Sequence, residues 1–158
     1  MSMTLWLNIR DGEHFKSNEE DHSAVFYLQE SLDEMASSLG VSPLSAFYDD
    51  TDLRYNMDES GEFDACEEGW PASAAKWFPA AAVQASVSAI LSHLQTHPMP
   101  LRHRRLCQSD AMEELRDFQS TLTHAVAEPG QCTLCHWLIV NADWPMRAPG
   151  GRCVVLKL

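Results

Sequence analysis

The most constraining feature of this sequence is an acidic window at residues 49–68. Nine of its residues are aspartate or glutamate and only Arg54 is basic, which leaves it with eight of the chain's twelve net negative charges. Like charges at this density repel one another, and burying them without compensation is costly. We therefore expect an exposed acidic loop at residues 49–71, with a hydrophobic core built from the segments before and after it.

Length and composition predict one globular domain. The 158 residues are enough to bury a sizeable core, and 45% hydrophobic with 22% charged content argues against disorder. The 23 acidic residues outnumber the 11 basic ones, which disfavours nucleic acid and anionic membrane as partners. A basic protein is the partner that this charge favours.

Cysteine content and the N-terminal sequence predict a cytoplasmic location. Residues 1–10 lack the apolar core and small-residue cleavage site of a signal peptide. No apolar run approaches the roughly 20 residues that span a bilayer. The five cysteines, an odd number, indicate free thiols in a reducing compartment.

The first half of the chain predicts a strand followed by a helix. Residues 4–10 alternate apolar and polar side chains, which is the pattern of a half-buried strand. Ser17 and Glu20 have the spacing of a capping box, so we expect helix 20–39 to begin there and Gly40 to end it. A short helix should open at Ser42 and Pro43. The apolar face expected for helix 20–39 is Val25, Leu28, Leu32, Met35 and Leu39.

Two further helices are predicted after the acidic window. Helix 79–97 should end before Pro98, and helix 110–127 should start with a capping box formed by Ser109 or Asp110 with Glu113. Their expected buried positions are Val83, Val87, Ile90 and Leu94 in the first, and Met112, Leu115, Phe118, Leu122 and Val126 in the second.

The C-terminal part predicts two strands. Residues 132–140 are almost wholly apolar and bounded by turn residues, which indicates a buried central strand, and residues 153–158 should form a last strand. The expected fold is therefore α+β, a single compact domain with three main helices packed on a small sheet.

Three short motifs suggest a resemblance. Leu5-Trp6-Leu7-Asn8, Thr51-Asp52-Leu53 with Asn56, and Lys76-Trp77-Phe78 resemble segments of small bacterial proteins that have no assigned activity. The resemblance implies a compact domain and no particular chemistry.

Part of the acidic window resembles the calcium loop of EF-hands. Gly61 stands at the sixth, sharp-turn position, and oxygen donors occupy alternate positions. The missing first aspartate and Pro71, which breaks the helix that should follow, count against calcium. The candidate ligands are Asn56, Asp58, Ser60, Asp64 and Glu67.

Cysteine and histidine motifs offer weaker candidates. Cys132, Cys135 and His136 form a C-x-x-C-H sequence, but in a strand residues three apart face opposite sides, so we interpret these cysteines as core residues. His93 and His97 share a helix face and could take zinc. Without a third ligand, the favoured interpretation is that they offset the helix dipole.

The leading functional hypothesis is a non-enzymatic, inhibitor-like or immunity-like module that contacts a basic partner. No G-x-S-x-G elbow and no glycine-rich phosphate loop is present. Calcium binding is the alternative, and a Cys or His enzyme comes third. The basic residues 102–105 are expected to form a loop that neutralises carboxylates. The candidate partner-binding residues are Asp49, Asp52, Asp58, Glu62, Asp64, Tyr55 and Trp70.

Overall fold

The structure is a computed structural model that describes most of the chain. The described residues are 2–11, 14–51, 54, 73–98, 100, 102–103, 105–127 and 131–139. The predicted strand at residues 153–158 lies outside them.

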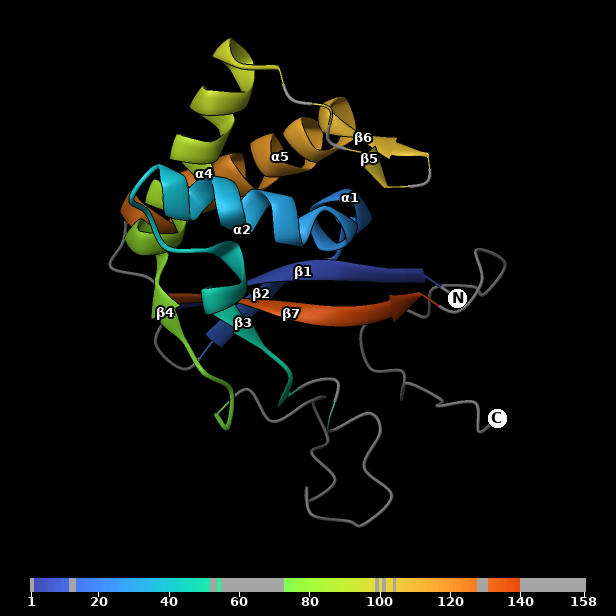
Figure 1. The fold of residues 1–158 in the computed structure, drawn as a ribbon. Coiled ribbons are helices and arrows are strands. Elements are labelled where there is room, and N and C mark those ends of the chain that lie inside the picture. The colour runs from blue at the N-terminus through green and yellow to red at the C-terminus, as the bar shows by residue number, and fades with distance from the viewer. Residues whose placement is uncertain are drawn as a thin grey trace.

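A five-stranded sheet forms the base of the fold. β1 (Ser2–Asp11) pairs antiparallel with β2 (His14–Asn18) on one side and with β7 (Gln131–Ile139) on the other. The outer edge of β7 carries two short strands, parallel β3 (Tyr48–Asp49) and antiparallel β4 (Phe78–Pro79). The predicted strands at 4–10 and 132–140 are thus confirmed, and β7 is central (Figure 1).

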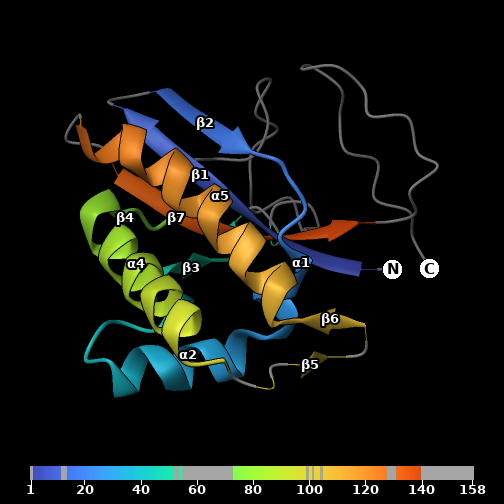
Figure 2. The same ribbon diagram turned by 90° about the horizontal axis from the view of Figure 1, so that it is seen from above.

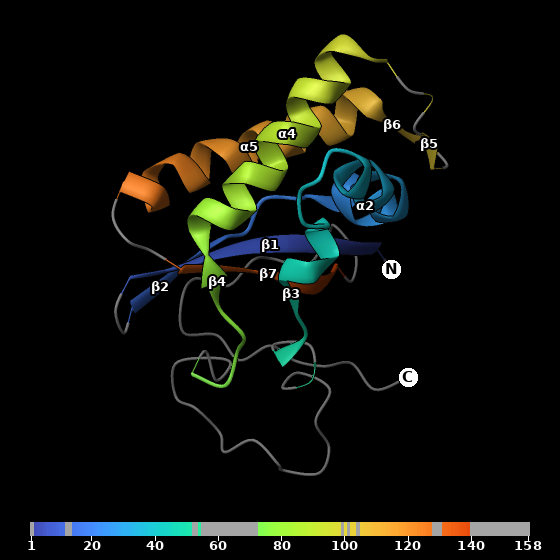
Figure 3. The same cartoon turned by 60° about the vertical axis from the view of Figure 1, so that its left-hand side comes forward.

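The helices lie together on one face of this sheet, as Figures 1 and 3 show. This arrangement confirms the α+β fold class. Seen from above in Figure 2, α4 and α5 run side by side over the sheet, with α5 nearly in line with β1. The helical elements are α1 (Ser23–Tyr27), α2 (Gln29–Ser38), the 3-10 helix η1 (Leu44–Phe47), α4 (Ala80–Thr96) and α5 (Gln108–Ala127).

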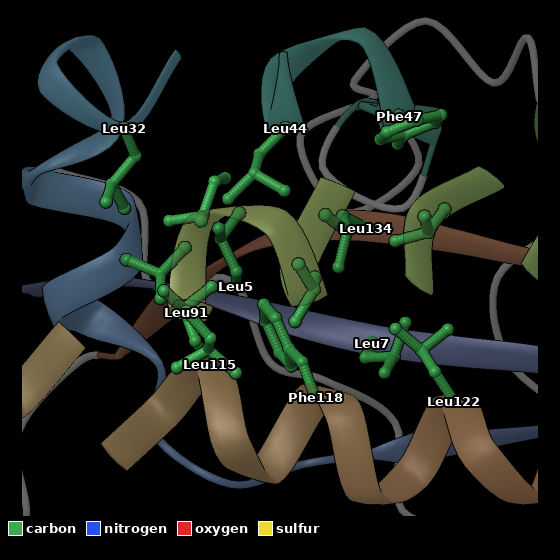
Figure 4. Packing of buried hydrophobic residues seen from close by; sticks show 14 of the residues in the cluster. Leu5, Leu7, Leu32, Leu44, Phe47, Leu91, Leu115, Phe118, Leu122 and Leu134 are labelled. Carbon is green, nitrogen blue, oxygen red and sulfur yellow. The ribbon is translucent and has the colours of Figure 1, made fainter. Parts of the chain in front are cut away.

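The core lies between the sheet and the helices (Figure 4). Leu5 and Leu7 of β1 and Leu134 of β7 are fully buried, because alternate residues of each strand face the helix layer. Helix residues spaced three and four positions apart form the opposite side of the core. The buried ones include Leu32 of α2, Val83, Val87, Ile90 and Leu94 of α4, and Leu115, Phe118 and Leu122 of α5.

The predicted start of the first helix is wrong. Ser17 lies in β2, where it pairs with Asn8 of β1 and donates its hydroxyl hydrogen to the Asn8 side chain. The helix begins only at Ser23, and a break at Leu28 divides the predicted helix into α1 and α2. The capping-box pattern of Ser17 and Glu20 does not start a helix, because Ser17 pairs instead with Asn8 of β1, nine residues earlier in the chain.

The predicted end of that helix is confirmed. Gly40 has a φ of +74°, and its N–H and that of Val41 donate to the carbonyls of Ser37 and Ala36 at 3.2 and 3.0 Å. These two bonds form a Schellman motif. Leu39 ends outside the core with 36% of its surface exposed, contrary to its predicted burial.

Near α5 three details of the prediction are wrong. β5 (Arg102–His103) and β6 (Leu106–Cys107) pair as two short antiparallel strands, where a loop was expected. The helix begins at Gln108, and the Asp110 carboxylate accepts the Cys107 N–H at 2.7 Å, so the capping pattern starts earlier than predicted. Val126 is 37% exposed, and Ala125 takes the buried place.

Replacing Gly40 tests the helix end. A Cβ at this position meets nothing within 4 Å, so Gly40→Ala should cost only the backbone strain of a left-handed L-residue, about 1 kcal/mol of unfolding free energy in urea. Gly40→Asn should lose less, because asparagine tolerates this conformation. Equal losses in both variants would contradict this explanation.

Candidate functional site

The two strands on either side of the acidic window pair with the same edge of the sheet. β3, in which the window begins, pairs with β7 at Leu134 and Cys135. β4, which lies ten residues after the window, pairs with the same strand at Cys132 and Gln131. The chain on both sides of the acidic window, called the acidic segment below, is therefore held on neighbouring stretches of one strand.

The carboxylate of Asp49 ties the two ends together. One oxygen accepts the backbone N–H of Thr51 at 2.9 Å, and the other accepts that of Lys76 at 3.0 Å. Residue 51 belongs to the outgoing chain and residue 76 to the returning chain. The half-buried Asp49 thus closes the base of the segment, a role that its charge alone did not predict.

Aromatic and basic side chains surround this base. The ring of Phe47 meets that of Phe78 edge-on, with centroids 5.5 Å apart, and the Lys76 ammonium lies 4.9 Å from the Phe78 centroid. The Arg10 guanidinium lies 5.6 Å from the ring of Trp77. These contacts attach the returning chain to both η1 and β1, and two cations offset part of the nearby negative charge.

Most of the predicted site residues lie outside the described part of the chain. Asp49 is described and has the anchoring contacts above. Beside it, Asp50 accepts a 3.1 Å bond from Arg54 in an exposed i, i+4 ion pair. The predicted residues that fall outside are Asp52, Tyr55, Asn56, Asp58, Ser60, Glu62, Asp64, Glu67 and Trp70.

A polar network that the sequence did not predict joins α5 to the chain between β2 and α1. Asp117 accepts from the Asn18 amide at 2.5 Å and from the His22 ring Nε2 at 2.8 Å. Asn18 also donates to Thr121 at 3.2 Å. Asp117 and Thr121 form a polar row with Glu114 along α5, but their partners are 89 or more residues away. The sequence therefore shows the polar row on α5 but not the distant residues that bond to it.

His22 is the buried member of this network. Only 1% of its side chain is exposed, and its ring packs on Phe118 with centroids 4.3 Å apart. Its Nδ1 donates to the carbonyl of Leu5 at 2.9 Å. A carbonyl oxygen and a carboxylate oxygen face its two nitrogens, so both ring nitrogens have a hydrogen-bond partner.

Glu114 provides the cap that α1 lacks locally. No side chain of the residue before α1 caps the helix, but the Glu114 oxygens accept the N–H groups of Ala24 at 3.0 Å and Val25 at 2.7 Å. Burial raises the pKa of Glu114, although the two N–H bonds and nearby His22 act in the opposite direction. This contact replaces the capping box predicted at Ser17.

These polar groups are structural in character. Both nitrogens of His22 are engaged, and the Ser17 hydroxyl is bonded to Asn8, so neither is placed as a base or nucleophile. Burial raises the pKa of the Cys132 thiol to about 12, which keeps it protonated and unreactive.

Within the described residues, no three histidine, cysteine, aspartate or glutamate side chains are grouped to hold a metal ion. No helix in this part of the chain is both long and apolar enough to cross a membrane.

Removing the shared acceptor tests the network. Asp117→Ala should lower the free energy of unfolding by about 1–3 kcal/mol in urea, because it leaves the buried His22 nitrogen without a partner. Glu113→Ala, which removes an exposed carboxylate from the same helix, should change it by less than about 0.5 kcal/mol. In a double-mutant cycle with His22→Gln, fully additive losses would refute the coupling.

The raised pKa of Glu114 predicts a pH effect. The folded state binds this proton more tightly than the unfolded state, whose value is near 4.5, so the stabilisation from protonation is complete below 4.5 and is lost as pH rises through the folded pKa. Urea unfolding between pH 4 and 8 should show wild type losing stability relative to Glu114→Gln as pH rises. The opposite trend would contradict the assignment.

Comparison of the chain with protein-family models, with curated proteins and with solved structures found no match. The functional argument therefore depends on the sequence and on the geometry described above.

Proposed function

We propose that this protein is a non-enzymatic binding module that presents the acidic segment, residues 49–68, to a basic protein partner. The observation that carries the proposal is the way this charge is attached. Eight of the twelve net negative charges belong to a segment that begins in β3 and precedes β4, and both of these strands pair with the same edge of β7.

Attachment at both ends favours recognition for a physical reason. Charges within about 10 Å of one another act together at physiological salt, and a concentrated patch raises the rate at which an oppositely charged partner arrives. Because Asp49 bonds to the backbone of Thr51 and Lys76, the chain is fixed to the folded body where the segment begins and again at residue 76, beyond its end. The acidic segment is therefore tethered on both sides at one place.

Aromatic residues near the base supply the second element of such an interface. Trp77 and Phe78 follow the segment, and both are only partly buried. Interfaces often depend on a few aromatic anchors, while the surrounding charges set the rate of association. The proposed binding surface therefore consists of these two residues together with residues predicted from the sequence, namely Asp52, Asp58, Glu62, Asp64, Tyr55 and Trp70.

The setting proposed for this function is the cytoplasm, with residues 1–158 acting as one domain. The two cysteines for which the structure gives a state, Cys107 and Cys132, are free thiols. Free thiols suit a reducing compartment, and the acidic balance of the chain disfavours nucleic acid as the partner.

Charge reversal with a matched control tests the proposal. Affinity capture followed by intact mass would identify the basic partner, whose association rate is then measured at several salt concentrations. Asp58→Lys, Glu62→Lys and Asp64→Lys together should slow association about tenfold at low salt and flatten its salt dependence. The control, Glu19→Lys, Glu34→Lys and Glu113→Lys, makes the same charge change at exposed positions elsewhere. Equal slowing in both triple variants would refute a localised binding surface.

Calorimetric titration with calcium separates this proposal from the alternative ligand. The missing aspartate at Asn56 and the proline at 71 predict no binding tighter than about millimolar at physiological salt. Micromolar affinity that disappears in Glu67→Gln would instead assign the segment to calcium.

A further inference from the structure

The end of α4 brings two histidines together on the surface. His93 lies in the last turn, and His97 follows the helix directly, donating its backbone N–H to the His93 carbonyl at 2.8 Å. Their rings are stacked, with centroids 4.6 Å apart and planes inclined by 11°. His97 is exposed and His93 is half-buried, so solutes can reach the pair.

The Thr96 hydroxyl determines which ring nitrogen of His97 has a free lone pair. Its hydroxyl lies 3.1 and 3.2 Å from the carbonyls of Ser92 and His93, which can only accept, so the hydroxyl hydrogen is directed to them. Toward His97 Nδ1, 2.8 Å away, the same oxygen must then accept. Nδ1 therefore carries a hydrogen, and in the neutral ring the lone pair lies on Nε2.

We propose that His93 and His97 form a two-nitrogen surface site for a borderline divalent transition metal ion such as Ni²⁺, Cu²⁺ or Zn²⁺. Imidazole nitrogen suits these ions, whereas Ca²⁺ and Mg²⁺ require oxygen ligands. The bond from His97 Nδ1 to Thr96 is the kind of outer contact that fixes the tautomer of a ligating histidine. Water completes the coordination shell.

Binding requires a small movement of the two rings. The lone pair of a ring nitrogen lies in the plane of its ring, and the two stacked planes are inclined by only 11°, so the lone pairs do not converge on one ion at about 2.0–2.1 Å. The rings must therefore rotate until their Nε2 atoms converge, and their exposure leaves room for this. The site is independent of the acidic segment, because a helix end supplies both ligands.

Titration of the untagged protein with NiCl₂ tests the site, after the accessible thiols have been alkylated so that they do not compete. We expect one ion per chain, with affinity about tenfold weaker in His93→Ala, in His97→Ala and in Thr96→Val. His124→Ala, which removes an exposed histidine from the last turn of α5, should leave the affinity unchanged.

Three outcomes would overturn the proposal. One is no saturable binding below about 1 mM. A second is one-to-one binding that survives His97→Ala, an exposed substitution that the fold should tolerate. Binding lost equally in His124→Ala would likewise show that the ion bridges histidines without a defined site.

Discussion

The pairing of β1 with β7 is the constraint on which the rest of the structure depends. Nine residues of each strand are opposite one another, from Ser2 with Ile139 to Arg10 with Gln131. These residues are more than 120 positions apart in sequence at every pair, so all the intervening elements must be accommodated around this ladder. The helices fill one face, and the outer edge of β7 pairs with β3 and β4, the strands on either side of the acidic segment. A disturbance of β7 would therefore affect the core and the segment's anchor together.

Side chains of α1 and of the residue before it bond to the part of the β1 edge that β2 does not reach. β2 pairs with β1 only from Leu7 to Asp11, so the earlier part of this edge needs other hydrogen-bond partners. The Tyr27 hydroxyl accepts the Met3 N–H at 3.1 Å, and His22 donates to the Leu5 carbonyl. Asp117 in turn holds His22 in place. A single polar network thus covers a strand edge and fixes α1 against α5.

These observations separate two uses of charge in one molecule. The Glu114 carboxyl group bonds to backbone N–H groups and that of Asp117 bonds to the buried His22, so both side chains serve to hold the fold together. Asp49 is intermediate, since it closes the base of the acidic segment. The acidic segment carries most of the net negative charge of the chain. This concentration of charge is the physical basis for proposing recognition of a basic partner.

Sequence alone determined the elements whose signal is local. Alternation identified β1, a continuous apolar run identified β7, and helical spacing identified α4 and α5. Gly40 marked a helix end, because only the adjacent backbone conformation matters there. The acidic window was equally evident, since charge density can be read directly from composition.

Tertiary structure alone decided the contacts between distant residues. The Ser17 pattern failed because strand pairing with Asn8 captured its hydroxyl, and the actual cap of α1 comes from Glu114, about 90 residues later. β3 and β4 have two residues each, too few for any periodicity to appear. The anchoring role of Asp49 and the hydrogen bond between His22 and Asp117 arise only when the chain brings these partners within hydrogen-bonding distance.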